Sequence, residues 1–168
     1  LVKRKTACEL SDRRVGSEMG IRNSFKRVIE NDSIGTFVTY KLVGQRMLKS
    51  GGGSIVTMSS VMGLRPGPVL GYGAGKAGIK NLTQALAVQW SKKNIRVNTI
   101  CPGWVDTPFI RKQEAAGRDL SPILNMTPLG RMASPSEIAN IALFLLSDLS
   151  SAMTGSVTVA DCGITLAG

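Results

Sequence analysis

The chain has 168 residues, a formal net charge of +10 and an apolar content of 43%. That length and that content suffice for one domain with a sizeable core, which argues against disorder over most of the chain. The sequence contains no histidine, which excludes a Ser-His-Asp or Cys-His catalytic site and most zinc sites. No apolar run approaches the roughly 20 residues of a membrane span, and the N-terminus has no apolar secretory segment. We therefore expect a cytoplasmic protein with no membrane partner.

The positive charge is scattered along the chain and does not alternate with aromatic residues. Its densest group, Lys3 to Lys5 with Arg13 and Arg14, lies near the N-terminus, and aromatic residues make up only 5% of the chain. A platform for stacking bases is not indicated, so we expect solvated surface charge and no nucleic-acid partner.

The cysteines are odd in number and far apart. Cys8, Cys101 and Cys162 form no C-x-x-C pair, so the sequence indicates neither a disulfide framework nor a metal cluster. We interpret them as buried free thiols.

Hydrophobic periodicity divides most of the chain into alternating helices and strands. Residues 1–22 show no clear apolar period, and we interpret them as a basic extension or a remnant. Ser134, Pro135 and Glu137 mark a helix start, with serine at the cap, proline at the first position and glutamate three residues after the serine. The predicted elements are a helix over 24–49, a strand over 54–58, a helix over 72–91, a strand over 95–100, a short helix within 106–117 on a lid-like excursion, a helix from 134 to about 146 and a strand over 156–160. Such alternation predicts an α/β fold of parallel βαβ units.

The stretch from Gly51 to Lys76 carries the chemistry. Tyr72 and Lys76 lie four residues apart, which places a phenol and an ammonium on one face of a helix, and the preceding strand ends in the pair Ser59-Ser60. A nearby ammonium favours the phenolate and lowers the pKa of a tyrosine, which can then exchange a proton with a substrate oxygen held by a serine hydroxyl. This set handles protons at a carbonyl or alcohol, and a hydride would have to come from a cofactor.

A second pattern, Gly73-Ala-Gly75-Lys-Ala-Gly78, matches G-x-G-x-x-G but lacks the context of a dinucleotide fingerprint. A loop rich in proline and glycine precedes it in place of a strand, and no acidic residue follows before Asp106. We therefore expect these glycines to let the helix approach its neighbours closely.

Four motifs of the chain resemble, in the same order, motifs of the short-chain dehydrogenase/reductase family. GGGSIVTMSSVMG is similar to its strand with the catalytic serine, and YGAGKAG to its Tyr-x-x-x-Lys signature. IRVNTICPGWVDTP is similar to its nicotinamide loop, and SPSEIANIALFLLSD with TGSVTVADCG to its last helix and strand. The matches run from about residue 25 to the C-terminus.

The resemblance implies a role for each matching residue. Tyr72 would be the general acid/base, and Lys76 would lower its pKa and hold the nicotinamide ribose. Ser60 would bind the substrate oxygen, with Ser59 as its alternative. The residues expected to line the nicotinamide and pyrophosphate side are Pro102, Gly103, Val105 and Thr107. The cofactor would be NAD or NADP, which the sequence does not distinguish.

The chain departs from the family pattern in three places. The first glycine-rich βαβ unit of the family has no counterpart before the first helix, so residues 23–168 resemble the C-terminal part of a Rossmann-like, doubly wound parallel sheet. Asp32 stands where the family carries an asparagine of its proton relay, so we include it among the catalytic residues. Cys162 replaces a glycine in the final Asp-Gly-Gly turn.

The expected substrate is a secondary alcohol or ketone, and LTQALAVQWSKKNIRVN is most similar to relatives acting on sugar acids and polyols. In the family, the helices matching 24–49 and 72–91 form the subunit interface, which implies a homodimer or homotetramer. The alternative is a truncated, cofactor-poor relative that acts only as an oligomerising or structural module. The start at Leu1 instead of methionine is compatible with a fragment.

Overall fold

The computed structural model describes residues 18–167, with side chains from residue 24 onward. The predicted extension over 1–22 falls mostly outside the described residues, and its last part already belongs to the first helix. The elements are α1 (Glu18–Ile29), the π-helical segment η1 (Glu30–Ile34), α2 (Gly35–Lys49), β1 (Gly53–Met58), the 3-10 turn η2 (Val61–Gly63), α3 (Leu70–Trp90), β2 (Ile95–Pro102), α4 (Pro108–Ala115), α5 (Ser121–Asn125), α6 (Pro135–Leu146) and β3 (Val157–Ala160), with further 3-10 turns at Ser91–Lys93 and Asp148–Ser150.

The sheet has the strand order β1-β2-β3 and is parallel throughout. Ile55 of β1 is opposite Val97 of β2, and Thr99 of β2 is opposite Val157 of β3. The central strand β2 is almost fully buried, as expected for a parallel strand covered on both faces. Of the described residues, none forms a strand on the other edge of β1.

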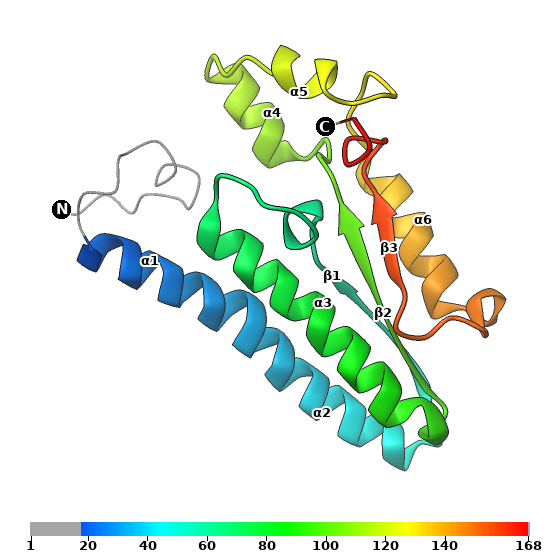
Figure 1. The fold of residues 1–168 in the computed structure, drawn as a ribbon. Coiled ribbons are helices and arrows are strands. Elements are labelled where there is room, and N and C mark those ends of the chain that lie inside the picture. Colours follow the sequence, from blue (N-terminus) through cyan, green and yellow to red (C-terminus); the bar gives the residue numbers. More distant parts are fainter. Residues whose placement is uncertain (1–17, 168) are drawn as a thin grey trace.

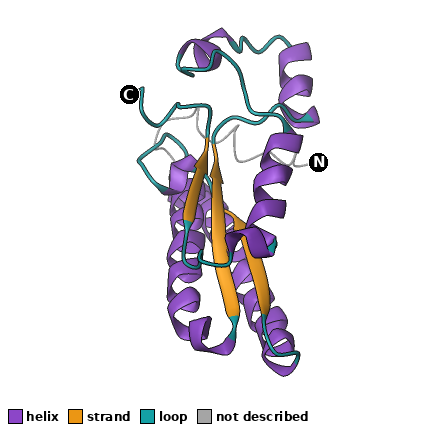
Figure 2. Cartoon of the chain, turned by 90° about the vertical axis from the view of Figure 1, so that its right-hand side faces the viewer, coloured by secondary structure: helices purple, strands orange, loops and turns teal. Residues whose placement is uncertain are grey.

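Helices cover both faces of the sheet, which confirms the predicted doubly wound α/β fold (Figures 1 and 2). On one face, α2 and α3 bury a cluster that includes Tyr40, Ala87 and Val97. On the other face, α6 buries a second cluster around Ile100 and Leu145. The strand residues therefore alternate between two cores, one on each side of the sheet.

The predicted start of α6 is confirmed in detail. The Ser134 hydroxyl accepts the Glu137 backbone N–H, and the Glu137 carboxylate accepts the Ser134 N–H, so the capping box is complete. At the other end of α6, the Arg96 guanidinium donates to the carbonyl oxygens of Leu145 and Ser147. These contacts satisfy carbonyls that a helix end leaves without partners.

The excursion after β2 contains two short helices, α4 and α5, of which the sequence indicated only the first. Ile110, Leu120, Ile123 and Met132 form a third cluster there, and this cluster fixes the excursion over the carboxyl end of the sheet (Figure 1). Within residues 18–167, no helix has both the length and the hydrophobicity to cross a bilayer. The cytoplasmic location stays a prediction.

The cysteines within the described part of the chain are free thiols, as expected. Cys101 is buried and Cys162 is half-buried, whereas Cys8 lies outside the described residues. Among residues 18–167, no group of three or more His, Cys, Asp or Glu side chains could hold a metal ion.

Candidate active site

The predicted catalytic side chains gather at the carboxyl ends of β1 and β2. Ser60 follows β1 and caps the turn η2, while Tyr72 and Lys76 lie in the first two turns of α3. The loop that follows β2 begins at Gly103 on the same edge of the sheet. Ligands of open parallel sheets bind at this edge, so these side chains form a candidate active site.

Lys76 is held by contacts from two directions. Its Nζ atom lies 3.7 Å from Asp32 Oδ1, donates to the Met58 carbonyl oxygen at 3.4 Å, and stands 5.4 Å from the centroid of the Tyr72 ring. The Lys76 side chain is only 14% exposed and that of Asp32 is 26% exposed. The two charges therefore interact in a partly desolvated place, where screening by water is weaker than at the surface.

Glycines of α3 allow this approach. A Cβ atom at Gly75 would lie 3.2 Å from the Cβ atom of Asp32, and one at Gly78 would lie 2.9 Å from the Ser33 hydroxyl. Ser33 donates to the Gly75 carbonyl oxygen at 3.2 Å across the same contact. The structure thus confirms that these glycines serve close helix packing, and it shows that this packing brings Asp32 to Lys76.

The two serines after β1 make different contacts. Ser59 Oγ donates to the Lys76 carbonyl oxygen at 2.7 Å, which ties the end of β1 to α3. Ser60 Oγ accepts the Met62 backbone N–H at 3.2 Å and also interacts with the Tyr72 hydroxyl. The geometry therefore gives Ser59 a structural contact and directs Ser60 toward the phenol.

The acidity of Tyr72 differs from the expectation. Burial raises the pKa of the Tyr72 phenol above its ordinary value; the Ser60 hydroxyl lowers this pKa and the Asp32 carboxylate raises it. We predicted that Lys76 would lower the pKa of Tyr72, and this prediction is wrong, because the pKa of the phenol is raised. The Lys76 ammonium stands over the Tyr72 ring and is paired with Asp32. The Asp32 carboxylate therefore offsets part of the positive charge that would otherwise stabilise the phenolate.

The loop after β2 is fixed mainly through its backbone. The Gly103 N–H donates to the Ala160 carbonyl oxygen at 3.1 Å, and a Cβ atom at Gly103 would lie 2.8 Å from that of Asp161. Val105 forms a bridge with Ala133 and packs into the α6 cluster. Pro102 ends β2, and Thr107 occupies the N-cap position of α4 without a side-chain capping bond.

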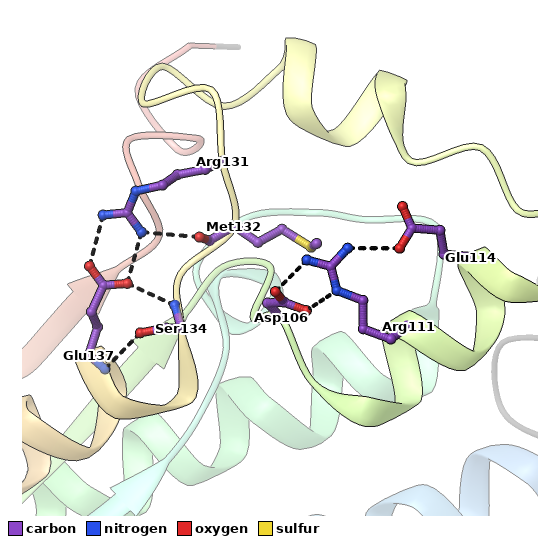
Figure 3. A network of polar contacts seen from close by, with 7 residues as sticks. All are labelled: Asp106, Arg111, Glu114, Arg131, Met132, Ser134 and Glu137. Atoms are coloured by element: carbon purple, nitrogen blue, oxygen red, sulfur yellow. Dashed lines mark hydrogen bonds and ion pairs between the residues drawn. The ribbon is translucent and has the colours of Figure 1, made fainter.

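Two ion-pair networks that we did not predict from the sequence hold the segments flanking this loop (Figure 3). Arg111 pairs with Asp106 and Glu114, and its hydrogen bonds lower the pKa of Asp106. Arg131 pairs with Glu137 and, together with the capping contacts of Ser134, lowers the pKa of Glu137 to about 2. The spacing of Arg111 and Glu114 on one helix face was a signal for the first network.

Comparison with known proteins gives consistent matches over most of the chain. The family model described as enoyl-(acyl carrier protein) reductase matches residues 16–165. The 3-oxoacyl-[acyl-carrier-protein] reductase FabG of Thermotoga maritima is 39% identical over 83% of this chain and 56% of its own length. Galactitol 2-dehydrogenase of Rhizobium johnstonii is 34% identical over 83% of this chain and 55% of its own length.

Solved structures share the fold. The structure of ElxO with NADP bound superimposes with a TM-score of 0.83 at 25% identity, over 94% of this chain and 61% of that chain. The chain thus spans about half the length of the curated relatives it matches.

Proposed function

Because the chain belongs to the short-chain dehydrogenase/reductase family of oxidoreductases, we propose that it supplies the catalytic residues of an NAD(P)-dependent interconversion of a secondary alcohol and a ketone. The observation that carries this proposal is the convergence of Ser60, Tyr72 and Lys76 at the carboxyl edge of the sheet. A hydroxyl donor next to a titrating phenol suits proton exchange with one substrate oxygen.

The donor set at this edge fits a nicotinamide cofactor. Lys76 has three N–H donors, of which one contacts the Met58 carbonyl, so it can also donate to the ribose hydroxyls together with Tyr72. Pro102, Gly103, Val105 and Thr107 would line the nicotinamide and pyrophosphate side. A bound nicotinamide cofactor supplies or accepts the hydride.

In the direction of carbonyl reduction, Ser60 would donate a hydrogen bond to the substrate oxygen and hold it next to the Tyr72 hydroxyl. Tyr72 would give its proton to that oxygen as the carbonyl carbon becomes a secondary alcohol carbon. In the direction of alcohol oxidation, the Tyr72 phenolate would take the proton back. Asp32 would join the proton path through Lys76, with which it is paired.

The proposed substrate class is a hydroxylated ketone such as a sugar acid or polyol derivative. The galactitol dehydrogenase supports this class, whereas the reductase of acyl-carrier thioesters represents a competing one. A panel that contains both classes of ketone separates them by turnover.

We further propose that the chain forms a homodimer or homotetramer through α1, α2 and α3. Several apolar side chains of α1, η1 and α2 are exposed, namely Phe25, Ile34, Phe37, Val38 and Leu42. The same observation favours the second candidate function, an oligomerising module without catalysis. Unpartnered apolar surface of this kind marks protein interfaces.

Turnover separates the two candidates, because a module without catalysis turns over neither NADH nor NADPH, and the variant Tyr72→Phe then tests the assigned catalytic residue. In a form of the protein that turns over NADH or NADPH, we expect Tyr72→Phe to lower turnover by at least about a hundredfold, because it removes the acid/base group. Tyr40→Phe is the matched control, since Tyr40 is the other tyrosine of the chain and its hydroxyl binds Thr57 and Thr83 inside the core. Turnover near wild type in Tyr72→Phe would exclude the catalytic assignment.

A further inference from the structure

Asp32 brings a negative charge to a place where an uncharged amide would also fit. It lies in the π-helical segment η1, whose wider turn interrupts the helix opposite Gly75. Its carboxylate is 3.7 Å from the Lys76 ammonium, and both side chains are mostly shielded from water. An asparagine there could hydrogen-bond to the ammonium, but it could not offset its charge.

The ammonium of Lys76 therefore has two competing anionic partners. One is the Asp32 carboxylate, which is already in place, and the other is the phenolate that Tyr72 forms when it loses its proton. The position of Nζ, 5.4 Å from the ring centroid and 3.7 Å from Asp32, shows which partner holds it while the phenol is neutral.

We propose that Asp32 is a positioning residue whose carboxylate holds the Lys76 ammonium and keeps the Tyr72 phenol in its protonated, proton-donating form. This inference rests on the proposed function only for its catalytic meaning, because the protonation of Tyr72 is measurable without turnover.

The other charged groups near the site face other partners. From α1 and η1, Lys26 and Glu30 pair with each other on an exposed surface. From the loop after η2, Arg65 donates to the carbonyl oxygens of Ile164 and Thr165. Lys80, one turn along α3, acts on the thiol of Cys101 at the end of β2. Among the described residues, Asp32 is thus the carboxylate that acts on Tyr72, and it raises the pKa of the phenol in addition to the effect of burial.

A protonated Tyr72 should make the rates of ketone reduction and alcohol oxidation depend differently on pH. A neutral phenol can give its proton to the oxygen of a ketone whose carbon takes the hydride from the reduced nicotinamide, and solvent then reprotonates the phenolate. The reverse reaction needs the phenolate before it can take the proton of the alcohol. The rate of reduction should therefore persist through neutral pH, whereas the rate of oxidation should rise only at alkaline pH.

The test is a titration of Tyr72 in the protein without cofactor. The chain contains only two tyrosines, so a sample labelled with ¹³Cζ-tyrosine gives two resonances, and Tyr40→Phe assigns them. In Asp32→Asn and Asp32→Ala, we expect the titration midpoint of Tyr72 to move to lower pH, because the phenolate gains the full charge of Lys76. Asp32→Glu should restore the midpoint toward wild type. Glu30→Gln, which removes a carboxylate from the same segment, should leave it unchanged.

Several results would overturn the proposal. These are an unchanged or raised midpoint in Asp32→Asn, an equal displacement in Glu30→Gln, or an Asp32→Asn protein that does not fold, since the carboxylate would then have a structural role. Folding is checked from the dispersion of the methyl resonances. Retained turnover in Tyr72→Phe would refute the proposed function and leave the titration result intact, so the two failures are distinguishable.

Discussion

Gly63→Ala tests how the loop after β1 is held against α3. A Cβ atom at Gly63 would lie 2.7 Å from the Lys76 carbonyl carbon and 2.8 Å from the Ala77 nitrogen. Carbon atoms attract each other best at about 3.5 Å or more, so the loop and the helix would have to separate by about 0.8 Å. Both contacting atoms belong to a helix backbone, so no side-chain rotation can relieve the clash.

We expect Gly63→Ala to lower the free energy of unfolding by about 1–3 kcal/mol, the usual cost of overpacking. For a chain of this size each kcal/mol corresponds to about 2–4 °C in Tm, which thermal unfolding followed by circular dichroism resolves. Gly35→Ala is the matched control, because a Cβ atom there meets only the Glu30 carbonyl oxygen at 3.6 Å. It lies in a helix, where alanine is favoured over glycine by about 1 kcal/mol, so this variant should be more stable.

The same displacement should affect the site. It moves Ser60, three residues before Gly63, away from Tyr72, and misplacement of a substrate-positioning group by about 1 Å can cost about a hundredfold in rate. If Gly63→Ala unfolds at the same temperature as wild type, the contact with the α3 backbone does not hold the loop, and this reasoning is refuted.

Three further predictions follow from local contacts. Cys162 has φ = 54°, a left-handed conformation that costs an L-residue about 1–2 kcal/mol. Cys162→Gly should therefore raise Tm slightly, although glycine has a larger unfolded-state entropy, and a lower Tm would contradict this. The exposed Phe37 and Leu42 should lie in a subunit interface, so light scattering should find a dimer or tetramer that Leu42→Glu dissociates, and a monomeric wild type would contradict the proposed association. Glu137 has its pKa lowered to about 2 from 4.5, so its pairing with Arg131 stabilises the fold above pH 4.5 and is lost as the pH falls toward 2; Glu137→Gln should flatten this part of an acid-unfolding curve.

Local signals were enough to predict most of the fold. The strands over 54–58, 95–100 and 156–160 are confirmed within a few residues, because buried parallel strands are short apolar runs with clear boundaries. The start of the helix at Ser134 is confirmed because its cap is built from neighbouring residues. Such features depend on a few consecutive side chains, and the sequence displays them directly.

The features that were missed depend on contacts between distant segments. The π-helical segment η1 within the predicted helix over 24–49 has no local signature, and neither does the start of α1 at Glu18. The spacing of Tyr72 and Lys76 predicts that they share a helix face, but it does not show that the ammonium is paired with Asp32. That pair depends on how closely η1 approaches α3, which is a property of packing. The raised pKa of Tyr72 follows from the same packing.

Contacts of the α3 backbone connect this packing to the chemistry of the site. On one side, Gly63 packs closely against the main chain of Lys76, and the Ser59 hydroxyl donates to the Lys76 carbonyl oxygen, so the end of β1 stays next to α3. On the other side, Gly75 lets Asp32 come close enough to pair with the Lys76 ammonium. Main-chain contacts of this kind lose little freedom and resist small movements, unlike ion pairs between long surface side chains. The position of the ammonium, and with it the protonation of Tyr72, therefore depends on Gly63 and on Gly75, and Gly75 belongs to a run whose spacing resembles a nucleotide-binding motif.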